Sequence, residues 1–357
     1  MEDALSIVVD RPEASDPKAI WVTWERHRRT RELSRALGTE LIELTTTLPR
    51  LARYLTLLVR TTLCIVRRAP SVVVVQCPSV MLGLWAALLK PVCRFTLVAD
   101  LHNDAVRPYT VKSGVYEWLI RIVHRAADLC LVSNSGLSPI VERSGGSAFV
   151  LPDKLPDLTP QPPETTDGGV AGFLSGTSER TRPTSCVVFI CSYAADEPYM
   201  EVIDAARALD PSVTVFVTGD HRKVTSLVTP ATVTLTGFLP DERYVALLNA
   251  ADVIVDLTRI DDCLVCGAYE AVALGKPLVT SDTRALREYF RLGTVYTKHD
   301  SQSLAAAITG ALDRKDTLSA EMRTLKAELA DTWTSQKDAL RRTLGRAKPR
   351  AVGQVVC

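Results

Sequence analysis

The sequence lacks an apolar run long enough to cross a membrane. Its most apolar region, Ser71–Cys93, is interrupted by Gln76, Pro78 and Lys90, whereas a spanning helix needs roughly 20 predominantly apolar residues. The region therefore predicts a buried strand followed by a core helix. The first residues, MEDALSIVVDRPE, are acidic and have no apolar core of the kind that secretory signals carry, so we expect a cytoplasmic protein.

The common nucleotide-binding and metal-binding motifs are also absent. No P-loop appears and no G-x-G-x-x-G follows an apparent strand, which argues against a kinase and against a nicotinamide-dependent enzyme. Cys263 and Cys266 form a C-x-x-C, but no second Cys/His pair lies at a ligand spacing, so we expect no metal and no bound cofactor. The nine cysteines, odd in number and irregularly spaced, are typical of reduced thiols.

The sequence has almost no net charge, but its charges are unevenly distributed. The formal total is +1, yet residues 21–125 contain 16 Lys/Arg and 7 Asp/Glu. Such an excess attracts phosphate, anionic lipid or nucleic acid; of these, we expect no nucleic-acid partner. The 357 residues, 46% of them apolar and 23% charged, predict a globular chain with two domains of about 150–180 residues each.

Short β-branched runs alternate with helical patterns along the chain. This alternation, without hairpin turn signals, predicts doubly wound parallel sheets covered by helices on both faces. The expected strands are 20–24, 40–44, 72–76, 94–99, 129–133, 148–151, 186–191, 213–218, 233–236, 253–257, 277–280 and 294–296. The expected helices are 26–37, 50–67, 80–89, 114–127, 197–209, 241–250, 284–290 and 301–312, with one or two more between 317 and 344.

A proline-rich stretch divides this pattern into two α/β halves. We expect an N-terminal domain at 1–155, a linker at 156–184, a C-terminal domain at 185–315, and C-terminal helices with a tail at 316–357. In such sheets ligands bind outside the carboxyl ends of the strands, so a cleft between the two halves is the expected place for a site.

The segment 261–282, DDCLVCGAYEAVALGKPLVTSD, contains the most specific pattern of the chain. It predicts a loop, a short helix that ends at Gly275, and a buried strand. Asp262 lies in the loop, and Glu270 lies eight positions later on the helix. Backbone N–H groups at a helix start can bind phosphate, and carboxylates can accept hydrogen bonds from sugar hydroxyls. Taken alone, Glu270 would also fit the exposed face of an amphipathic helix.

This half resembles the donor half of GT-B glycosyltransferases, particularly the family 4 (group 1) type. In that family a loop glutamate and a helical glutamate eight positions later, ahead of A-x-A-x-G-x-P-V, hold a nucleotide sugar. Asp262 and Glu270, followed by EAVALGKPLV, match this motif. The resemblance implies two Rossmann-like domains facing a cleft, with Glu270 on the ribose and Asp262 on the hexose. The backbone of Cys263, Leu264 and Val265 would meet the diphosphate.

Two neighbouring segments extend the resemblance. TGFLPDERYVALLNAA, at 236–251, is similar to the family segment that lies against the nucleotide base. In it, Phe238 and Leu239 would contact the base or belong to the core. SYAADEPY, at 192–199, corresponds to a loop near the diphosphate, which places Tyr193 in the donor site.

The chain departs from the family pattern in two ways. Asp262 is one methylene shorter than the usual glutamate, which bears on the sugar that is preferred. The loop at 192–199 has neither the Arg nor the Lys that many relatives use to neutralise the diphosphate. Helix dipoles, or a base such as Arg222, Lys223 or Arg259, would have to replace it, and the sequence does not choose among them.

The N-terminal half is similar to the acceptor domain of bacterial polysaccharide-assembling glycosyltransferases and to the dolichol-pathway β-mannosyltransferases. VVVVQCPSVMLGLWAALL and VADLHND carry the second likeness, and WVTWERHRRTRELSRAL carries the first. Asp100, His102 and Asn103 close a buried strand, so we expect them at the cleft. His102 and Asp100 would act in proton transfer and Asn103 in acceptor binding. Alternatively, a backbone group satisfies His102.

Trp24, Glu25, Arg28 and Arg29 are expected to open a helix after the first strand. We predict that Trp24, Glu25 and Arg28 contact the acceptor. Arg28 and Arg29 would meet an acceptor phosphate or form a solvated basic face.

The segment 51–68, LARYLTLLVRTTLCIVRR, which falls on the helix expected at 50–67, combines an apolar face with several arginines. Burial of the apolar face in the core is the first interpretation. The alternative is that the helix also rests on an anionic membrane that presents a lipid-linked acceptor.

We therefore expect a cytoplasmic or peripherally membrane-bound glycosyltransferase of polysaccharide or glycoconjugate synthesis. It would move a hexose from a UDP- or GDP-linked sugar to a glycan or lipid-linked acceptor, without a metal. Retention and inversion of the anomeric configuration both stay open. A nucleotide-sugar 2-epimerase on the same fold and a non-catalytic partner subunit are the alternatives.

Overall fold

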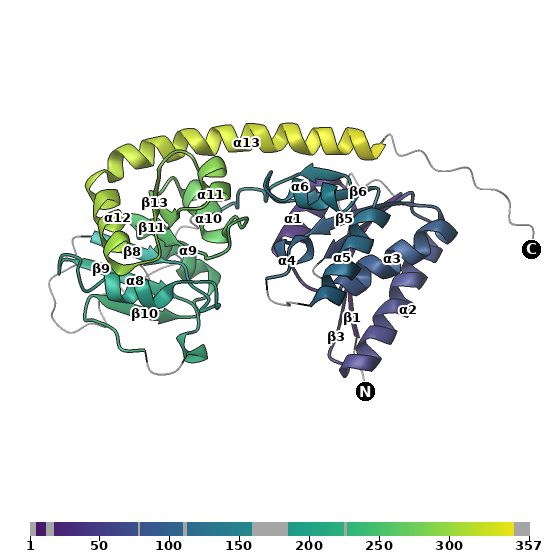
Figure 1. The fold of residues 1–357 in the computed structure, drawn as a ribbon, viewed down its shortest axis with the longest axis horizontal. Coiled ribbons are helices and arrows are strands. Elements are labelled where there is room, and N and C mark those ends of the chain that lie inside the picture. Colours follow the sequence, from purple (N-terminus) through teal and green to yellow (C-terminus); the bar gives the residue numbers. More distant parts are fainter. Residues whose placement is uncertain are drawn as a thin grey trace, which may run out of the picture. The chain divides into compact units, whose positions relative to one another are not determined.

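A computed structural model describes residues 5–11, 18–77, 79–109, 113–158, 185–224 and 227–345, which belong to two compact units (Figure 1). Unit 1 comprises residues 1–154 together with 332–357, and unit 2 comprises residues 155–331. Among the described residues, each unit is built on one sheet, of seven strands in unit 1 and six in unit 2. From position 159 onward, the linker expected at 156–184 lies outside the described residues.

The sheet of unit 1 has the order β1-β3-β2-β4-β5-β6-β7. Its strands are β1 (Leu5–Asp10), β2 (Ala19–Thr23), β3 (Glu40–Thr46), β4 (Val72–Cys77), β5 (Thr96–Leu101), β6 (Leu129–Val132) and β7 (Ala148–Val150). Every neighbouring pair from β3 to β7 is parallel. β2 and β4 are buried along their whole length, as expected of parallel strands that are covered on both faces.

β1 corrects the sequence-based expectation of fully parallel sheets. It pairs antiparallel with β3, from Leu5 opposite Thr46 to Asp10 opposite Leu41. The sequence predicted no strand before Ile20, because Ile7, Val8 and Val9 belong to an edge strand and remain partly exposed. An edge strand lacks the long buried run by which the central strands are recognised.

Helices cover both faces of the unit 1 sheet. They are α1 (Arg28–Leu37), α2 (Arg50–Arg68), α3 (Val80–Cys93), α4 (Asn103–Val106), α5 (Gly114–Ala126) and α6 (Ser138–Arg143). α2, α3 and α5 bury residues such as Leu57, Leu82 and Val123 in one core cluster. On the other face, α1 and the end of the C-terminal helix pack around Trp21 and Val74.

Unit 2 is a fully parallel sheet with the order β10-β9-β8-β11-β12-β13. Its strands are β8 (Ser185–Phe189), β9 (Val213–Thr218), β10 (Val233–Gly237), β11 (Val253–Asp256), β12 (Leu278–Ser281) and β13 (Thr294–Thr297). The strand order reverses between β8 and β11. In open α/β sheets such a reversal is the topological switch point at which ligands bind.

The helices of unit 2 pack on both faces around two core clusters. They are α8 (Tyr199–Ala205), the 3₁₀ turn η1 (His221–Lys223), α9 (Asp241–Ala250), α10 (Cys266–Leu274), α11 (Arg284–Tyr289) and α12 (Ser301–Asp313). Gly275 ends α10 in a left-handed conformation with φ 67°, which confirms the predicted helix stop. α8 is shorter than the expected helix at 197–209, because the chain continues in turns after Ala205.

The C-terminal region forms the single helix α13 (Lys315–Gly345). Its first half contributes Met322 and Leu325 to the core of unit 2. Its second half contributes Trp333 and Leu340 to the core of unit 1. None of the helices in the described part of the chain is both long and apolar enough to span a bilayer.

Candidate functional site

The switch point of unit 2 brings two predicted loops together. β8 and β11 pair in parallel, and the N–H of Ile190 donates to the carbonyl of Val255 at 2.9 Å. The loop after β8 contains Tyr193, and the loop after β11 contains residues 262–265. These residues are far apart in sequence, yet their loops leave adjacent strands at the same edge of the sheet.

Glu270 is buried on α10, so it is not a residue of an exposed helix face. The hydroxyl of Tyr244, on α9, donates to Glu270 Oε2 at 2.5 Å. Burial, followed by the charge of Glu270, raises the pKa of Tyr244, which keeps this hydroxyl protonated as a donor. The contact fixes the carboxylate on the helix that follows the predicted diphosphate loop.

The side-chain carboxyl group of Asp256, at the end of β11, lies against the first turn of α10. Its Oδ2 accepts the N–H of Gly267 at 2.6 Å, and the N–H of Ala268 also donates to this carboxyl. Burial raises the pKa of Asp256, and these two hydrogen bonds oppose the rise. From the sequence we expected a helix start open to phosphate, but two N–H groups of the first turn already bind the protein's own carboxyl group. The sequence did not indicate this contact, because Asp256 has the pattern of a residue in a buried strand.

The residues of the loop at 262–265 differ in how deeply they are buried. Asp262 and Cys263 are half-buried, whereas the side chains of Leu264 and Val265 belong to the core of unit 2. The side chains of these last two residues therefore face the core, and their backbone is the part left for contact with a ligand.

Tyr193 lies in a loop that Glu197 organises. The Glu197 carboxylate accepts the N–H groups of Ser192 and Ala194 at 2.8 and 3.0 Å. Tyr193 has a φ of 61° and stacks edge-to-face on Tyr199. Its ring is buried, and its hydroxyl has no hydrogen-bond partner in the described part of the chain. A buried hydroxyl normally finds a partner, so this one is a candidate ligand contact.

The three candidate bases differ in their surroundings. Arg222 pairs with Asp220, and Arg259 pairs with Glu201. Lys223 instead donates to the carbonyl of Ser192 at 3.1 Å, and no carboxylate among the described residues pairs with it. Of the three, Lys223 keeps its charge uncompensated beside the Tyr193 loop.

The two residues predicted near the nucleotide base differ in how exposed their side chains are. The side chain of Phe238 is 81% exposed. Leu239 is partly buried against the core of unit 2. Phe238 is thus the one with apolar surface available to a flat ligand.

Unit 1 has a polar cluster at its own switch point, between β2 and β4. Thr23, at the end of β2, donates to Gln76 at the end of β4. The amide nitrogen of the same side chain, Gln76 Nε2, lies 3.3 Å from His102 Nε2. The rings of His27 and His102 meet edge-to-face, with centroids 4.3 Å apart. Burial, the largest cause, lowers the pKa of His102 to about 4, so its imidazole is neutral near pH 7.

Asp100 is completely buried beneath this cluster and binds Arg29. Arg29 donates to Asp100 Oδ1 through Nε and Nη2 at 3.1 and 3.0 Å, and also pairs with Asp153. The expectation that Arg29 meets a phosphate or solvent is wrong, because two carboxylates hold it in the interior. The partners Gln76 and Asp153 were not predicted, because each lies in a different loop or strand, far away in sequence.

The remaining acceptor candidates are not gathered into one site. Trp24 is buried, and its Nε1 donates to Thr61 at 3.0 Å. Glu25 is exposed, and Arg28 is exposed and pairs with Glu32. Both precede or begin α1, which starts at Arg28 rather than at Arg26. Asn103, half-buried, is the first residue of α4.

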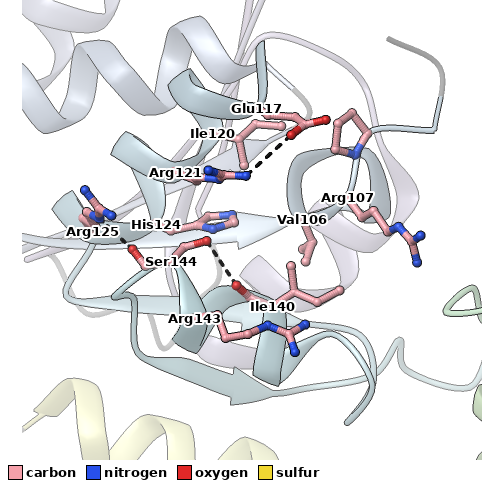
Figure 2. Close-up of a pocket in the computed structure, with 11 residues that line it drawn as sticks. Val106, Arg107, Glu117, Ile120, Arg121, His124, Arg125, Ile140, Arg143 and Ser144 are labelled. Atoms are coloured by element: carbon pink, nitrogen blue, oxygen red, sulfur yellow. Dashed lines mark hydrogen bonds and ion pairs between the residues drawn. The ribbon is translucent and has the colours of Figure 1, made fainter. Parts of the chain in front are cut away.

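A basic pocket of about 680 Å³ lies between α5, α6 and the end of α4 (Figure 2). Arg107, Arg121, Arg125 and Arg143 line it together with His124. Arg121 contacts Glu117, and Arg125 donates to the carbonyl of Ser144. The pocket was not predicted from the sequence, because its arginines lie on α5, on α6 and directly after α4.

Comparison with known proteins agrees with this architecture. Residues 185–314 match the family model "Glycosyl transferases group 1". No curated protein sequence matches the chain. The structure is similar to HepE from Anabaena in complex with UDP and glucose, with a TM-score of 0.71, 17% identity, and coverage of 92% of this chain and 91% of that chain.

Two further solved structures share the fold. For sucrose-phosphate synthase from Thermosynechococcus elongatus, the TM-score is 0.68, the identity is 16%, and the match covers 92% of this chain and 100% of that chain. For a putative UDP-N-acetylglucosamine 2-epimerase from Listeria monocytogenes, the corresponding values are 0.56, 13%, 86% and 91%. The predicted fold class, two Rossmann-like α/β domains of the GT-B type, is confirmed.

Proposed function

We propose that the protein transfers a hexose from a nucleoside diphosphate sugar to a glycan or lipid-linked acceptor, because residues 185–314 match the group 1 glycosyltransferase model. The observation that carries the proposal is the buried Glu270 held by Tyr244 on the helix after the diphosphate loop. A buried carboxylate next to a ligand-facing loop is suited to ribose hydroxyls, which donate two hydrogen bonds to it.

The donor site would be assembled at the switch point of unit 2. Glu270 would bind the ribose, and Asp262 the hexose. The backbone of residues 263–265 would bind the diphosphate, and Phe238 with Leu239 would lie against the base. The hydroxyl of Tyr193 would then find the partner that it lacks. UDP is the first nucleotide to test, because the solved HepE structures contain UDP and UDP-glucose.

Lys223 is our candidate for neutralising the diphosphate. It is the one of the three candidate bases with no carboxylate partner among the described residues, and it sits on the carbonyl of Ser192. The charge that develops on the leaving diphosphate needs donors already in place. Asp256 occupies part of the α10 start, which makes a separate positive charge more necessary.

We assign the acceptor to unit 1. The neutral imidazole of His102 can exchange a proton with an acceptor hydroxyl, and we propose it as the catalytic residue. Asp100 would act indirectly, by anchoring Arg29 beneath it. Trp24, Glu25, Arg28 and Asn103 stay candidates for acceptor contact.

The basic pocket favours an acceptor that carries phosphate. Four guanidinium groups line it, and arginine is well matched to phosphate oxygens. A lipid diphosphate-linked glycan has both the phosphate and the hydroxyl. We accordingly propose a role in polysaccharide or glycoconjugate synthesis in the cytoplasm.

Calorimetric titration of the purified chain with a panel of UDP- and GDP-sugars tests the donor site. The wild type should bind at least one of them. Glu270→Ala should abolish binding, and Tyr244→Phe should weaken it about tenfold by freeing the carboxylate. Glu242→Gln, which changes an exposed carboxylate on α9, is the matched control and should bind like the wild type. Unchanged binding by Glu270→Ala would refute the site.

A nucleotide-sugar 2-epimerase is the second candidate, favoured by the likeness to the Listeria structure. An epimerase needs no acceptor. Release of an epimerised sugar nucleotide from the bound donor, in the absence of any acceptor, would favour it over transfer. Failure of the wild type to bind any donor would support a non-catalytic partner subunit.

A further inference from the structure

An exposed apolar stripe runs along α2 in unit 1. Five large apolar side chains, each between 37% and 81% exposed, form it: Leu51, Leu55, Val59, Leu63 and Val66. At 3.6 residues per turn they lie within about a third of the helix circumference. The core-facing side of α2 is a different one, formed by Leu57, Thr61 and Ile65. Core burial therefore accounts for one side of this helix and leaves the stripe unexplained.

The neighbouring helices continue the stripe into a broader surface. α3 packs against α2, where Trp85 Nε1 donates to Thr62 at 2.9 Å, and α5 packs against α3. All three cover the same face of the sheet, so their outer sides point away from it in the same direction. α3 and α5 add five apolar side chains between 42% and 79% exposed: Met81, Leu88, Val92, Val115 and Trp118. We call these ten residues the α2–α3–α5 surface.

The charge on α2 and α3 has one sign, whereas α5 carries Glu117, which pairs with Arg121. α2 carries five arginines and no acidic residue, and the whole stretch between Glu43 and Asp100 contains seven basic residues and no acidic one. Arg60 and Arg67 are exposed on the flank of the stripe. Within the described residues, neither has a carboxylate partner.

We propose that the α2–α3–α5 surface docks on an anionic lipid bilayer. Contiguous exposed apolar side chains mark interaction sites, and an apolar stripe flanked by unpaired arginines is complementary to acyl chains beneath acidic headgroups. An exposed tryptophan fits the same boundary, where its ring lies between apolar and polar regions. The inference does not depend on the proposed transferase activity, because docking needs neither donor nor acceptor.

The test is co-sedimentation of the full chain with vesicles. Phosphatidylcholine vesicles that contain phosphatidylglycerol should bind the wild type at low salt, and added salt should weaken the binding. Phosphatidylcholine alone should bind it far more weakly. Arg60→Gln/Arg67→Gln should lose about 25-fold, since each arginine contributes about fivefold. Leu55→Ser/Val59→Ser should lose about tenfold through lost apolar insertion.

Matched variants separate docking from general changes in charge or hydropathy. Arg342→Gln, on the part of α13 that packs on the other face of the sheet, and Val228→Ser, exposed in unit 2, should bind vesicles like the wild type. Donor titration should be the same for all of these variants, so that a failure of the proposed function shows itself separately.

Three results would overturn the inference. They are equal binding to neutral and acidic vesicles, unchanged binding by the two double variants, and a monomer–dimer shift in those variants without a change in vesicle binding. The last result would assign the surface to a second copy of the chain.

Discussion

His102 illustrates how one side chain is set by its neighbours. Gln76 lies against its Nε2, and His27 covers its ring. Burial outweighs the favourable charge of Asp100 and lowers the pKa of His102 to about 4. A neutral imidazole at physiological pH can accept a proton on one nitrogen and donate one from the other. The Gln76 amide lies against Nε2 and therefore helps to set which ring nitrogen carries the proton.

The same pKa predicts an acid-dependent loss of stability. The folded-state pKa lies below the ordinary value of 6.5, so the stabilising contribution is complete above pH 6.5 and is lost as the pH falls toward about 4. The expected slope is about 1.4 kcal/mol per pH unit for each such histidine. Urea unfolding of the wild type and of His102→Gln across this range measures it. The variant should have the shallower slope, and equal slopes would contradict the assignment.

At the scale of elements, α10 is fixed to β11 by the Asp256 contact. A Cβ at Gly267 would lie 2.5 Å from Asp256 Oδ2 and equally close to Ile190 Cδ1. This position must therefore be glycine for the helix to start so near the carboxyl group. The close approach also joins the loops after β8 and β11, which hold the proposed donor residues.

Gly267→Ala should lower the free energy of unfolding by about 2 kcal/mol, because the new methyl group overpacks this junction. Gly310→Ala is a matched control inside α12, where an added Cβ meets nothing within 4 Å. The control should raise stability by about 0.5–1 kcal/mol, through the better helix propensity of alanine. Denaturant unfolding checks both changes. An unchanged free energy of unfolding for Gly267→Ala would show that the junction can accommodate the added methyl group.

The elements that the sequence predicted well are those with local signals. The bounds of α9 agree with the predicted 241–250, and Gly275 ends α10 where expected. What escaped prediction depends on pairing between distant residues. The contact of Arg29 with Asp100 spans 71 positions, and neither residue alone indicates it. The proposed donor residues were found through a motif, whereas the Asp256 contact came only from the structure.

At the scale of the whole molecule, the core of unit 1 is completed by residues of α13. Trp333 is buried there, and its Nε1 donates to the carbonyl of Pro152 at 3.1 Å. Leu340 is completely buried in the same cluster. The second half of the C-terminal helix is therefore part of the same unit as β1.

Trp333→Ala should destabilise unit 1 by about 3–5 kcal/mol, the usual loss for a large buried aromatic side chain. Calorimetry should show a lower melting temperature for one of two transitions. Donor binding should persist, because the proposed donor residues all belong to unit 2. Trp118→Ala removes an exposed tryptophan and is the matched control. A parallel loss of donor binding would show that the two units are not energetically separable.

The way the chain is divided between the two units also sets the order in which they can fold during synthesis. Unit 2 is one continuous segment, whereas unit 1 takes residues from both ends of the sequence. Domains generally fold as they emerge during synthesis, so unit 2 can complete its core while unit 1 still waits for Trp333 and Leu340. Unit 1, most of which is translated before unit 2, therefore completes its hydrophobic core after unit 2.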